Sequence, residues 1–137
     1  EEYWDNDDSL FRSEVGVPGA SSAEITRKYS GGLPELPANL DNPLWRRTAW
    51  WIQWEDFLKE AGREPRNLEE FVEWSRKRQA VGLALAVRTC KRRFPKCGGI
   101  ILWMGHDCFP CTANTSIFDF HGCPKPAVQA VAHVYCA

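Results

Sequence analysis

The sequence has no large excess of charge of either sign. Its 137 residues include 17 basic and 18 acidic side chains, which give a formal net charge of −1. Proteins that hold nucleic acid or an anionic membrane through charge usually have a basic excess, so this composition favours neither partner. Long apolar runs are also missing, because none approaches the roughly 18 residues of a membrane-spanning helix. We therefore expect no nucleic-acid partner and no membrane partner.

Internal repeats and low-complexity segments are absent as well, which excludes a solenoid or a long linker. A length of 137 residues is typical of about one domain. The first eight residues are acidic and irregular, and no Met precedes them. We expect a segment of a longer protein, and the sequence leaves its localisation open.

Six cysteines raise the question of a metal site. Cys108 and Cys111 have the two-residue spacer of zinc ligands, with His121 and Cys123 nearby, so a small zinc-stabilised domain is one interpretation. The His121–Cys123 spacing does not suit an ordinary zinc knuckle. A Cys108–Cys111 disulfide or a redox role is a second interpretation. The default is free thiols packed as small apolar groups, and we expect no metal and no cofactor.

Most of the chain has helical patterns. Ser22 is expected to cap a short helix, and Asn42 a helix that runs from Pro43 to Ala61. Asn67 with Glu70 three residues later resembles a capping box at the start of the next helix. A last helix is predicted from Pro126. Four tryptophans fall on the helix that begins at Pro43, and their spacing favours core or barrel-wall packing over a carbohydrate-binding surface: Trp45, Trp50, Trp51 and Trp54.

Two short strands end in polar residues. One is predicted near residues 10–13, and Glu14 follows it. The other, residues 100–103, is apolar enough to be buried on both faces, and it leads to His106 and Asp107. Active sites of α/β barrels lie at the C-terminal ends of the strands. A carboxylate at one strand end and a Trp103–Asp107 pair at the other suggest a sugar-processing site.

These residues resemble a known family. Ser13-Glu14-Val15-Gly16 is similar to the nucleophile motif of family 2 glycoside hydrolases, which include β-mannosidases, β-galactosidases and β-glucuronidases. The segment 102–110 resembles their eighth barrel strand, where a Trp precedes an Asp by four residues. The segment 116–127 resembles the following turn and last helix, in which we expect Asp119 to bond backbone amides and residues 116–120 to form a short strand. β-Mannosidase-like members look closest.

The resemblance implies an α/β, helix-rich fold that is the C-terminal fragment of a (β/α)8 TIM barrel. Residues 1–137 would form a single partial domain with strands seven and eight and their helices. Glu14 would be the nucleophile of a retaining β-glycosidase, Trp103 would stack on the sugar, and Asp107 and His106 would bond its hydroxyls. The implied partners are a carbohydrate substrate and the remainder of the barrel, and no cofactor is required.

The chain departs from the family in two places. Met104-Gly105-His106-Asp107 stands where the family has a Gln-x-Asn-Asp style sequence, so polar contacts to the sugar would differ. The family's general acid/base is a Glu after an Asn on strand four, and this chain contains no Asn-Glu dipeptide. We therefore expect the isolated chain to be inactive and, with apolar faces uncovered, to self-associate.

A second interpretation belongs to a different class of protein. The chain would be a non-catalytic carbohydrate-binding or interaction domain derived from a barrel. An Asn-Glu pair encoded upstream would favour the enzyme. The sequence does not choose among mannose, galactose, glucose and glucuronic acid.

Overall fold

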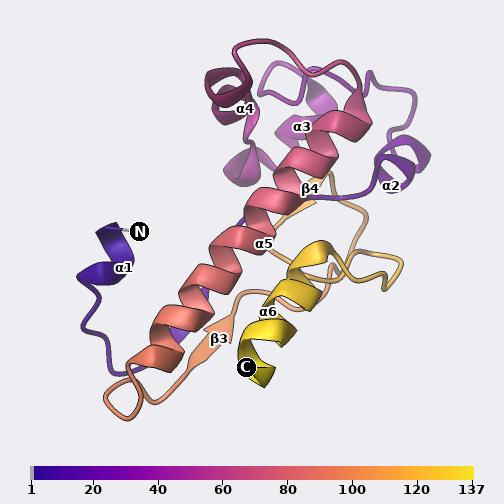
Figure 1. Cartoon of the computed structure of the whole chain (residues 1–137). Helices are drawn as coiled ribbons and strands as arrows, with labels where there is room; N and C mark the ends of the chain where they lie inside the picture. Colours follow the sequence, from indigo (N-terminus) through magenta and orange to yellow (C-terminus); the bar gives the residue numbers. More distant parts are fainter. Residues whose placement is uncertain (1) are drawn as a thin grey trace.

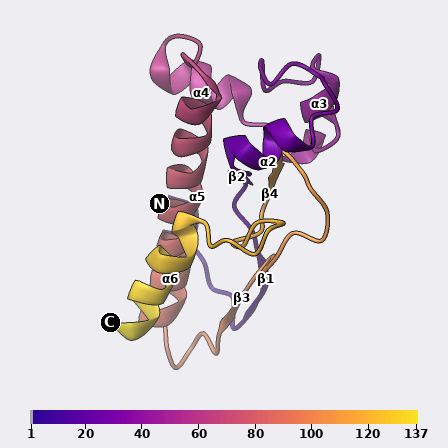
Figure 2. The same ribbon diagram turned by 90° about the vertical axis from the view of Figure 1, so that its right-hand side faces the viewer.

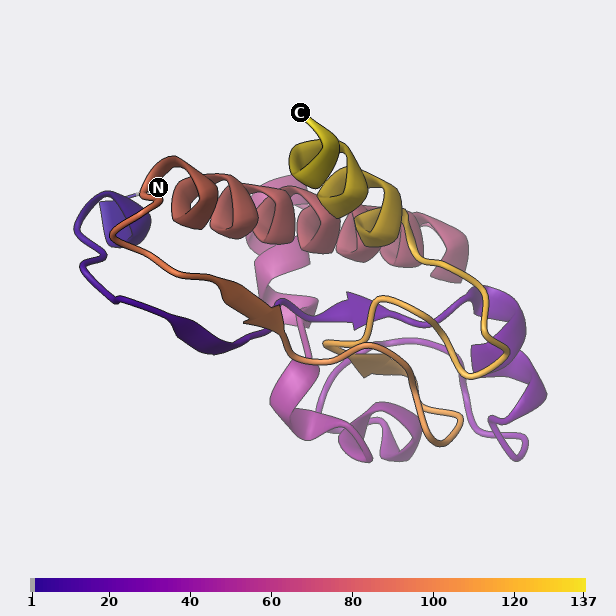
Figure 3. The same ribbon diagram turned by 90° about the horizontal axis from the view of Figure 1, so that it is seen from below.

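The computed structural model describes residues 2–137, which form a helix-rich α/β structure. One layer holds the two helices α5 (Leu68–Arg92) and α6 (Pro126–Cys136), which lie side by side. The strands β1 (Arg12–Val15) and β3 (Ile100–Leu102) lie in a second layer against them (Figures 1 and 3). The remaining elements are α1 (Glu2–Asp5), β2 (Gly19–Ala20), α2 (Ala23–Lys28), α3 (Pro43–Arg46), the 3-10 helix η1 (Ala49–Trp51), α4 (Trp54–Ala61) and β4 (Ala113–Asn114).

The strands form two small sheets. β1 and β3 are parallel neighbours, with Arg12 opposite Ile100 and Val15 opposite Leu102. β1 therefore has one more residue than β3 between these pairs, which is the count of a β-bulge. β2 and β4 continue from the strand ends as an antiparallel pair, and Figure 2 shows them beyond β1 and β3 toward α2.

Within residues 2–137, only one face of the β1–β3 pair is buried. Val15, Ile100 and Leu102 pack with the core that α5 and α6 supply. Side chains alternate between faces along a strand, and Ile101, on the opposite face, is 55% exposed. The prediction that residues 100–103 are buried on both faces is therefore wrong for residues 2–137.

The cap of α5 is confirmed, but its capping box is only half formed. The Asn67 side chain accepts a hydrogen bond from the Glu70 amide at 2.9 Å, as predicted. Glu70 does not reach back to the amide of Asn67. Its carboxylate instead accepts from the Arg66 amide and pairs with the guanidinium of Arg63. These charges lower the pKa of Glu70, with the Arg63 hydrogen bond as the largest cause.

The single helix predicted from Pro43 to Ala61 is divided into α3, η1 and α4. Trp45 is 1% exposed and Trp54 is 5% exposed, and both rings contact Phe71, at centroid distances of 5.4 and 6.0 Å. In one continuous helix, positions nine residues apart would lie about 180° apart around the axis. Breaking the helix lets both rings face the same partner, while Trp50 is left 90% exposed. Core packing is thus confirmed for Trp45 and Trp54. Trp50 does not pack in the core of residues 2–137, and its packing in a barrel wall stays a prediction.

The loop before α6 also differs from expectation. The predicted strand at residues 116–120 is not formed, because Phe118 makes only isolated bridges with His106 and Pro124. The chain turns here instead: Asp119 accepts hydrogen bonds from the amides of His121 and Cys123, at 3.0 and 2.9 Å. The structural role expected for Asp119 is confirmed.

Within residues 2–137, no helix is long and apolar enough to cross a membrane.

Candidate functional site

Glu14 lies near the C-terminal end of β1, in the irregular part of its pairing with β3. Its side chain is exposed, whereas its neighbour Val15 packs toward the helices. Ser13 and Glu14, the two residues of the bulge that oppose Ile101, are both exposed, which places Glu14 on the face that the helices leave uncovered. β-Bulges occur next to active sites, where they change the direction of a side chain.

Trp103 lies directly beside this position, at the end of β3. Its amide donates a hydrogen bond to the Val15 carbonyl at 2.8 Å, and its side chain is 45% exposed. Gly16 lets the two strand ends approach closely, because a Cβ there would lie 2.7 Å from the Trp103 carbonyl oxygen. The structure therefore brings the predicted Glu14 and Trp103 to neighbouring strand ends, on one uncovered face.

The other two predicted site residues lie differently. His106 is exposed and forms an isolated bridge with Phe118. Asp107 is 1% exposed, and its Oδ1 accepts a hydrogen bond from the Asn114 amide group at 2.9 Å. Its Oδ2 is buried without a partner among the described residues. Direct contact of Asp107 with a sugar stays a prediction, since its observed partner is Asn114.

A buried ammonium group was missed by reasoning from the sequence. Lys125 is 1% exposed, and its Nζ donates to the Gly19 carbonyl at 3.0 Å and to Ser116 Oγ at 3.1 Å. Burial lowers the pKa of Lys125 to about 8, and the attraction of Asp107 opposes this shift. Its neighbours in the sequence, Pro124 and Pro126, give no sign that the lysine is buried. The ammonium group ties the loop before α6 to the start of β2.

Gln79 supports the same region from α5 and was also missed. Its amide group donates to the Val17 carbonyl at 2.9 Å and to the Ser116 carbonyl at 3.0 Å. It therefore joins the segment that follows β1 to the segment that follows β4. An isolated Gln in a helix carries no signal for this role in the sequence.

The cysteine interpretations are not supported by the arrangement of the thiols. All six cysteines are free, so the Cys108–Cys111 disulfide is not formed. Cys108 and Cys123 are exposed, whereas Cys111 is buried and burial raises its pKa to about 12. A thiol with this pKa stays protonated at neutral pH and is a poor nucleophile. In the part of the chain that the structure describes, no three His, Cys, Asp or Glu side chains form a possible metal site.

Comparisons with known proteins identify relatives of one kind. No family model matches the chain. Over 81 residues, 57% of this chain, it is 36% identical to β-mannosidase B of Aspergillus flavus and of Aspergillus oryzae. The corresponding protein of Aspergillus terreus is 35% identical over the same length. The match covers 10% of each of these proteins, so the chain spans a small part of the relatives it resembles.

A solved structure shares the fold. The crystal structure of β-D-mannosidase from Dictyoglomus thermophilum matches with a TM-score of 0.78 and 19% sequence identity. The match covers 96% of this chain and 16% of that chain. Together, the sequence similarity and the shared fold support a relationship of this chain to glycoside hydrolases, with β-mannosidases as the relatives found.

Proposed function

We propose that residues 1–137 are the C-terminal part of the catalytic barrel of a retaining β-glycosidase that resembles β-mannosidases. In this proposal β1 and β3 are strands seven and eight of a family 2 (β/α)8 barrel, and the chain is a single partial domain. The uncovered face of the strand pair is the barrel interior, against which the remainder of the barrel packs. Until it does so, the exposed face favours self-association.

One observation carries the proposal: Glu14 and Trp103 lie at the C-terminal ends of neighbouring parallel strands, on the same uncovered face. This is the end of the strands at which barrel enzymes hold their catalytic residues. A carboxylate beside an exposed indole suits a sugar, because the indole face can stack on the apolar C–H face of a pyranose while the carboxylate reaches the anomeric carbon.

A retaining mechanism needs two carboxyl groups, one as the nucleophile and one as the general acid/base. Glu14 attacks the anomeric carbon, and the bond to the leaving oxygen breaks as a glycosyl–enzyme ester forms. A second carboxyl group, about 5–5.5 Å away, protonates the leaving group and then activates the water that hydrolyses the ester. Asp107 is buried and bonded to Asn114, which does not suit that role. We assign the second carboxyl to the upstream part of the protein, so the isolated chain is inactive.

The remaining residues shape the sugar site. Trp103 forms its floor, and His106 offers an exposed ring for a sugar hydroxyl. Asp107 offers a sugar hydroxyl its Oδ2, which has no partner within residues 2–137, while its Oδ1 accepts a hydrogen bond from the Asn114 amide group at 2.9 Å. No cofactor takes part in this mechanism.

The test uses the gene product at its native length. A 2-deoxy-2-fluoro-β-mannosyl fluoride traps the covalent intermediate of a retaining β-mannosidase, and mass spectrometry then locates the label. We expect the label on the peptide that contains Glu14, loss of turnover in Glu14→Gln, and normal turnover in Glu55→Gln, an exposed glutamate on α4. Near-normal activity of Glu14→Gln, or a label on another peptide, would refute the assignment.

The length of the native product separates this proposal from the non-catalytic interpretation. An immunoblot of source-cell lysate with an antibody against this chain should detect a species several times larger than 15.6 kDa. A product of 15.6 kDa leaves no place for the second carboxyl or a closed barrel. A carbohydrate-binding or interaction domain would then be the better explanation.

A further inference from the structure

We infer that a cavity beside the start of β4 is a binding site for a small organic anion, whose carboxylate or phosphate group is held by Arg47 and Thr26. The cavity has a volume of about 240 Å³ and is lined by residues of α2, of α3 with the two residues after it, and of the segment 109–112. The inference does not depend on the glycosidase proposal, because none of the residues assigned there lines this cavity.

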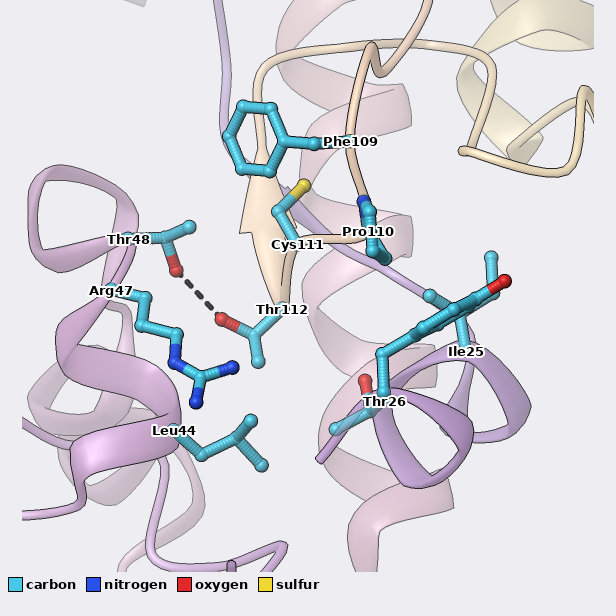
Figure 4. Close-up of a pocket in the computed structure, with 10 residues that line it drawn as sticks. Ile25, Thr26, Leu44, Arg47, Thr48, Phe109, Pro110, Cys111 and Thr112 are labelled. Atoms are coloured by element: carbon cyan, nitrogen blue, oxygen red, sulfur yellow. Dashed lines mark hydrogen bonds between the residues drawn. The ribbon is translucent and has the colours of Figure 1, made fainter. Parts of the chain in front are cut away.

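The walls come from three parts of the chain that are distant in sequence. Figure 4 shows Ile25 and Thr26 on one side, Leu44 and Arg47 on the other, and the segment 109–112 closing the space between them. A hydrogen bond of 2.6 Å between the hydroxyls of Thr48 and Thr112 joins two of these walls. The cavity is therefore built by tertiary contacts and is not a groove along one helix.

The hydroxyl of Thr26 is the first sign of a ligand. Thr26 is 2% exposed and lines the cavity, and its Oγ1 has no hydrogen-bond partner among the described residues. A buried polar atom that stays unpaired costs roughly 1–3 kcal/mol. Since nearly all buried polar groups in proteins are paired, a ligand or water in the cavity is the natural partner of this hydroxyl.

The charge of the lining is the second sign. Among residues 2–137, Arg47 is the one charged residue that lines the cavity, and no acidic residue lines it. The ion pairs within residues 2–137 leave Arg47 without a carboxylate partner. A guanidinium presents a fork of N–H donors that matches the oxygens of a carboxylate or a phosphate. The thiol of Cys111 brings no negative charge, because burial raises its pKa to about 12.

Size and the remaining walls define the rest of the ligand. The cavity volume of about 240 Å³ suits a small molecule. Leu44, Phe109 and Pro110 contribute apolar side chains to the lining. The site thus fits an anionic group attached to a compact apolar or ring-shaped body.

Binding of simple probes to the 137-residue chain tests the inference. Benzoate and phenyl phosphate represent the two anionic groups, benzyl alcohol is the neutral counterpart, and inorganic phosphate lacks the apolar body. We expect the aromatic anions to shift the NMR signals of residues 26, 47 and 112 at millimolar concentrations, and benzyl alcohol to bind more weakly. If benzoate binds more tightly than phenyl phosphate, the site prefers a carboxylate; if phenyl phosphate binds more tightly, it prefers a phosphate group.

Matched variants locate the binding. Arg47→Gln should weaken the better anion about tenfold or more, because hydrogen bonds to charged groups are the strong ones. Arg46→Gln, at an exposed neighbour that does not line the cavity, should leave the affinity unchanged. Thr26→Val should weaken binding without lowering the urea midpoint, since it removes an unpaired hydroxyl. The site is refuted if no anion binds, if benzyl alcohol binds equally well, or if Arg46→Gln has the same effect as Arg47→Gln.

Discussion

Raising the pH from about 7 to about 10 should stabilise the folded chain through Lys125. Its ammonium group is 1% exposed, and burial lowers its pKa from an ordinary value of 10.5 to about 8. Between these two values the folded chain has released the proton and the unfolded chain still holds it. The free energy of unfolding rises with pH wherever the unfolded state binds more protons. Below pH 8 both states are protonated, and the gain is absent.

The magnitude follows from the same two values. Each pKa unit corresponds to 1.36 kcal/mol, so the interval between 10.5 and about 8 gives about 3 kcal/mol across the full window. Two forces compete here, since burial lowers the pKa of Lys125 while Asp107 raises it. If the attraction of Asp107 were the larger force, the pKa would be raised and stability would fall with pH.

Two buried cysteines change the stability in the opposite direction as the pH rises, so their contribution has to be subtracted from that of Lys125. Burial raises the pKa of Cys111 to about 12 and that of Cys90 to about 11, from 9.0. Above pH 9 their thiols ionise first in the unfolded chain, which lowers stability. Lys125→Met retains these thiols and lacks the ammonium group, so the informative quantity is the difference in stability between wild type and Lys125→Met.

Urea unfolding followed by tryptophan fluorescence measures this difference at each pH. We expect it to grow in favour of wild type from pH 8 upward, by up to about 3 kcal/mol near pH 10.5. A difference that stays constant, or that shrinks as the pH rises, would refute the conclusion that Lys125 is held in the fold at a desolvation cost.

Three further substitutions test the fold and the site. Gly16→Ala should destabilise the chain by about 1–3 kcal/mol in urea unfolding, because its Cβ would lie 2.7 Å from the Trp103 carbonyl oxygen. Gly105→Ala has nothing within 4 Å of the added Cβ, so an equal loss there would contradict this reasoning. Phe71→Ala should cost about 3–5 kcal/mol in the same assay, because its ring is 1% exposed; a loss below about 1 kcal/mol would mean that the core closes around the gap. Asn67→Ala should lower stability by about 1 kcal/mol, and an unchanged urea midpoint would show that the cap on α5 contributes nothing.

Local signals in the sequence predicted the elements that depend on neighbouring residues. The caps of α2 and α5 were predicted correctly, because the cap residue and the amide it accepts from lie three residues apart in the chain. The strand with residues 100–102 and the helix from Pro126 were also predicted, from an apolar run and from a proline at a helix start. These choices depend on backbone geometry within one turn or one strand.

Packing between distant segments explains the errors in the fold. The helix predicted over residues 43–61 has the right spacing for one continuous element, yet Trp45 and Trp54 both pack on Phe71 and so require a break. The strand at residues 100–102 is apolar throughout, but the described part of the chain covers only one of its faces. The apolar pattern of a sequence indicates which residues will be buried, but it does not indicate which segment packs against them.

For the candidate site, the sequence by itself determined which residues to propose: Glu14 and Trp103 were predicted at the ends of two short strands, and the order of their motifs resembles that of one family. Only the tertiary structure decided that these residues are neighbours, because pairing of parallel strands joins segments that are far apart in the chain. It likewise decided that Asp107 and Lys125 are buried and that the Arg47 cavity exists. Burial and enclosure are properties of several segments packed together, and no single stretch of sequence encodes them.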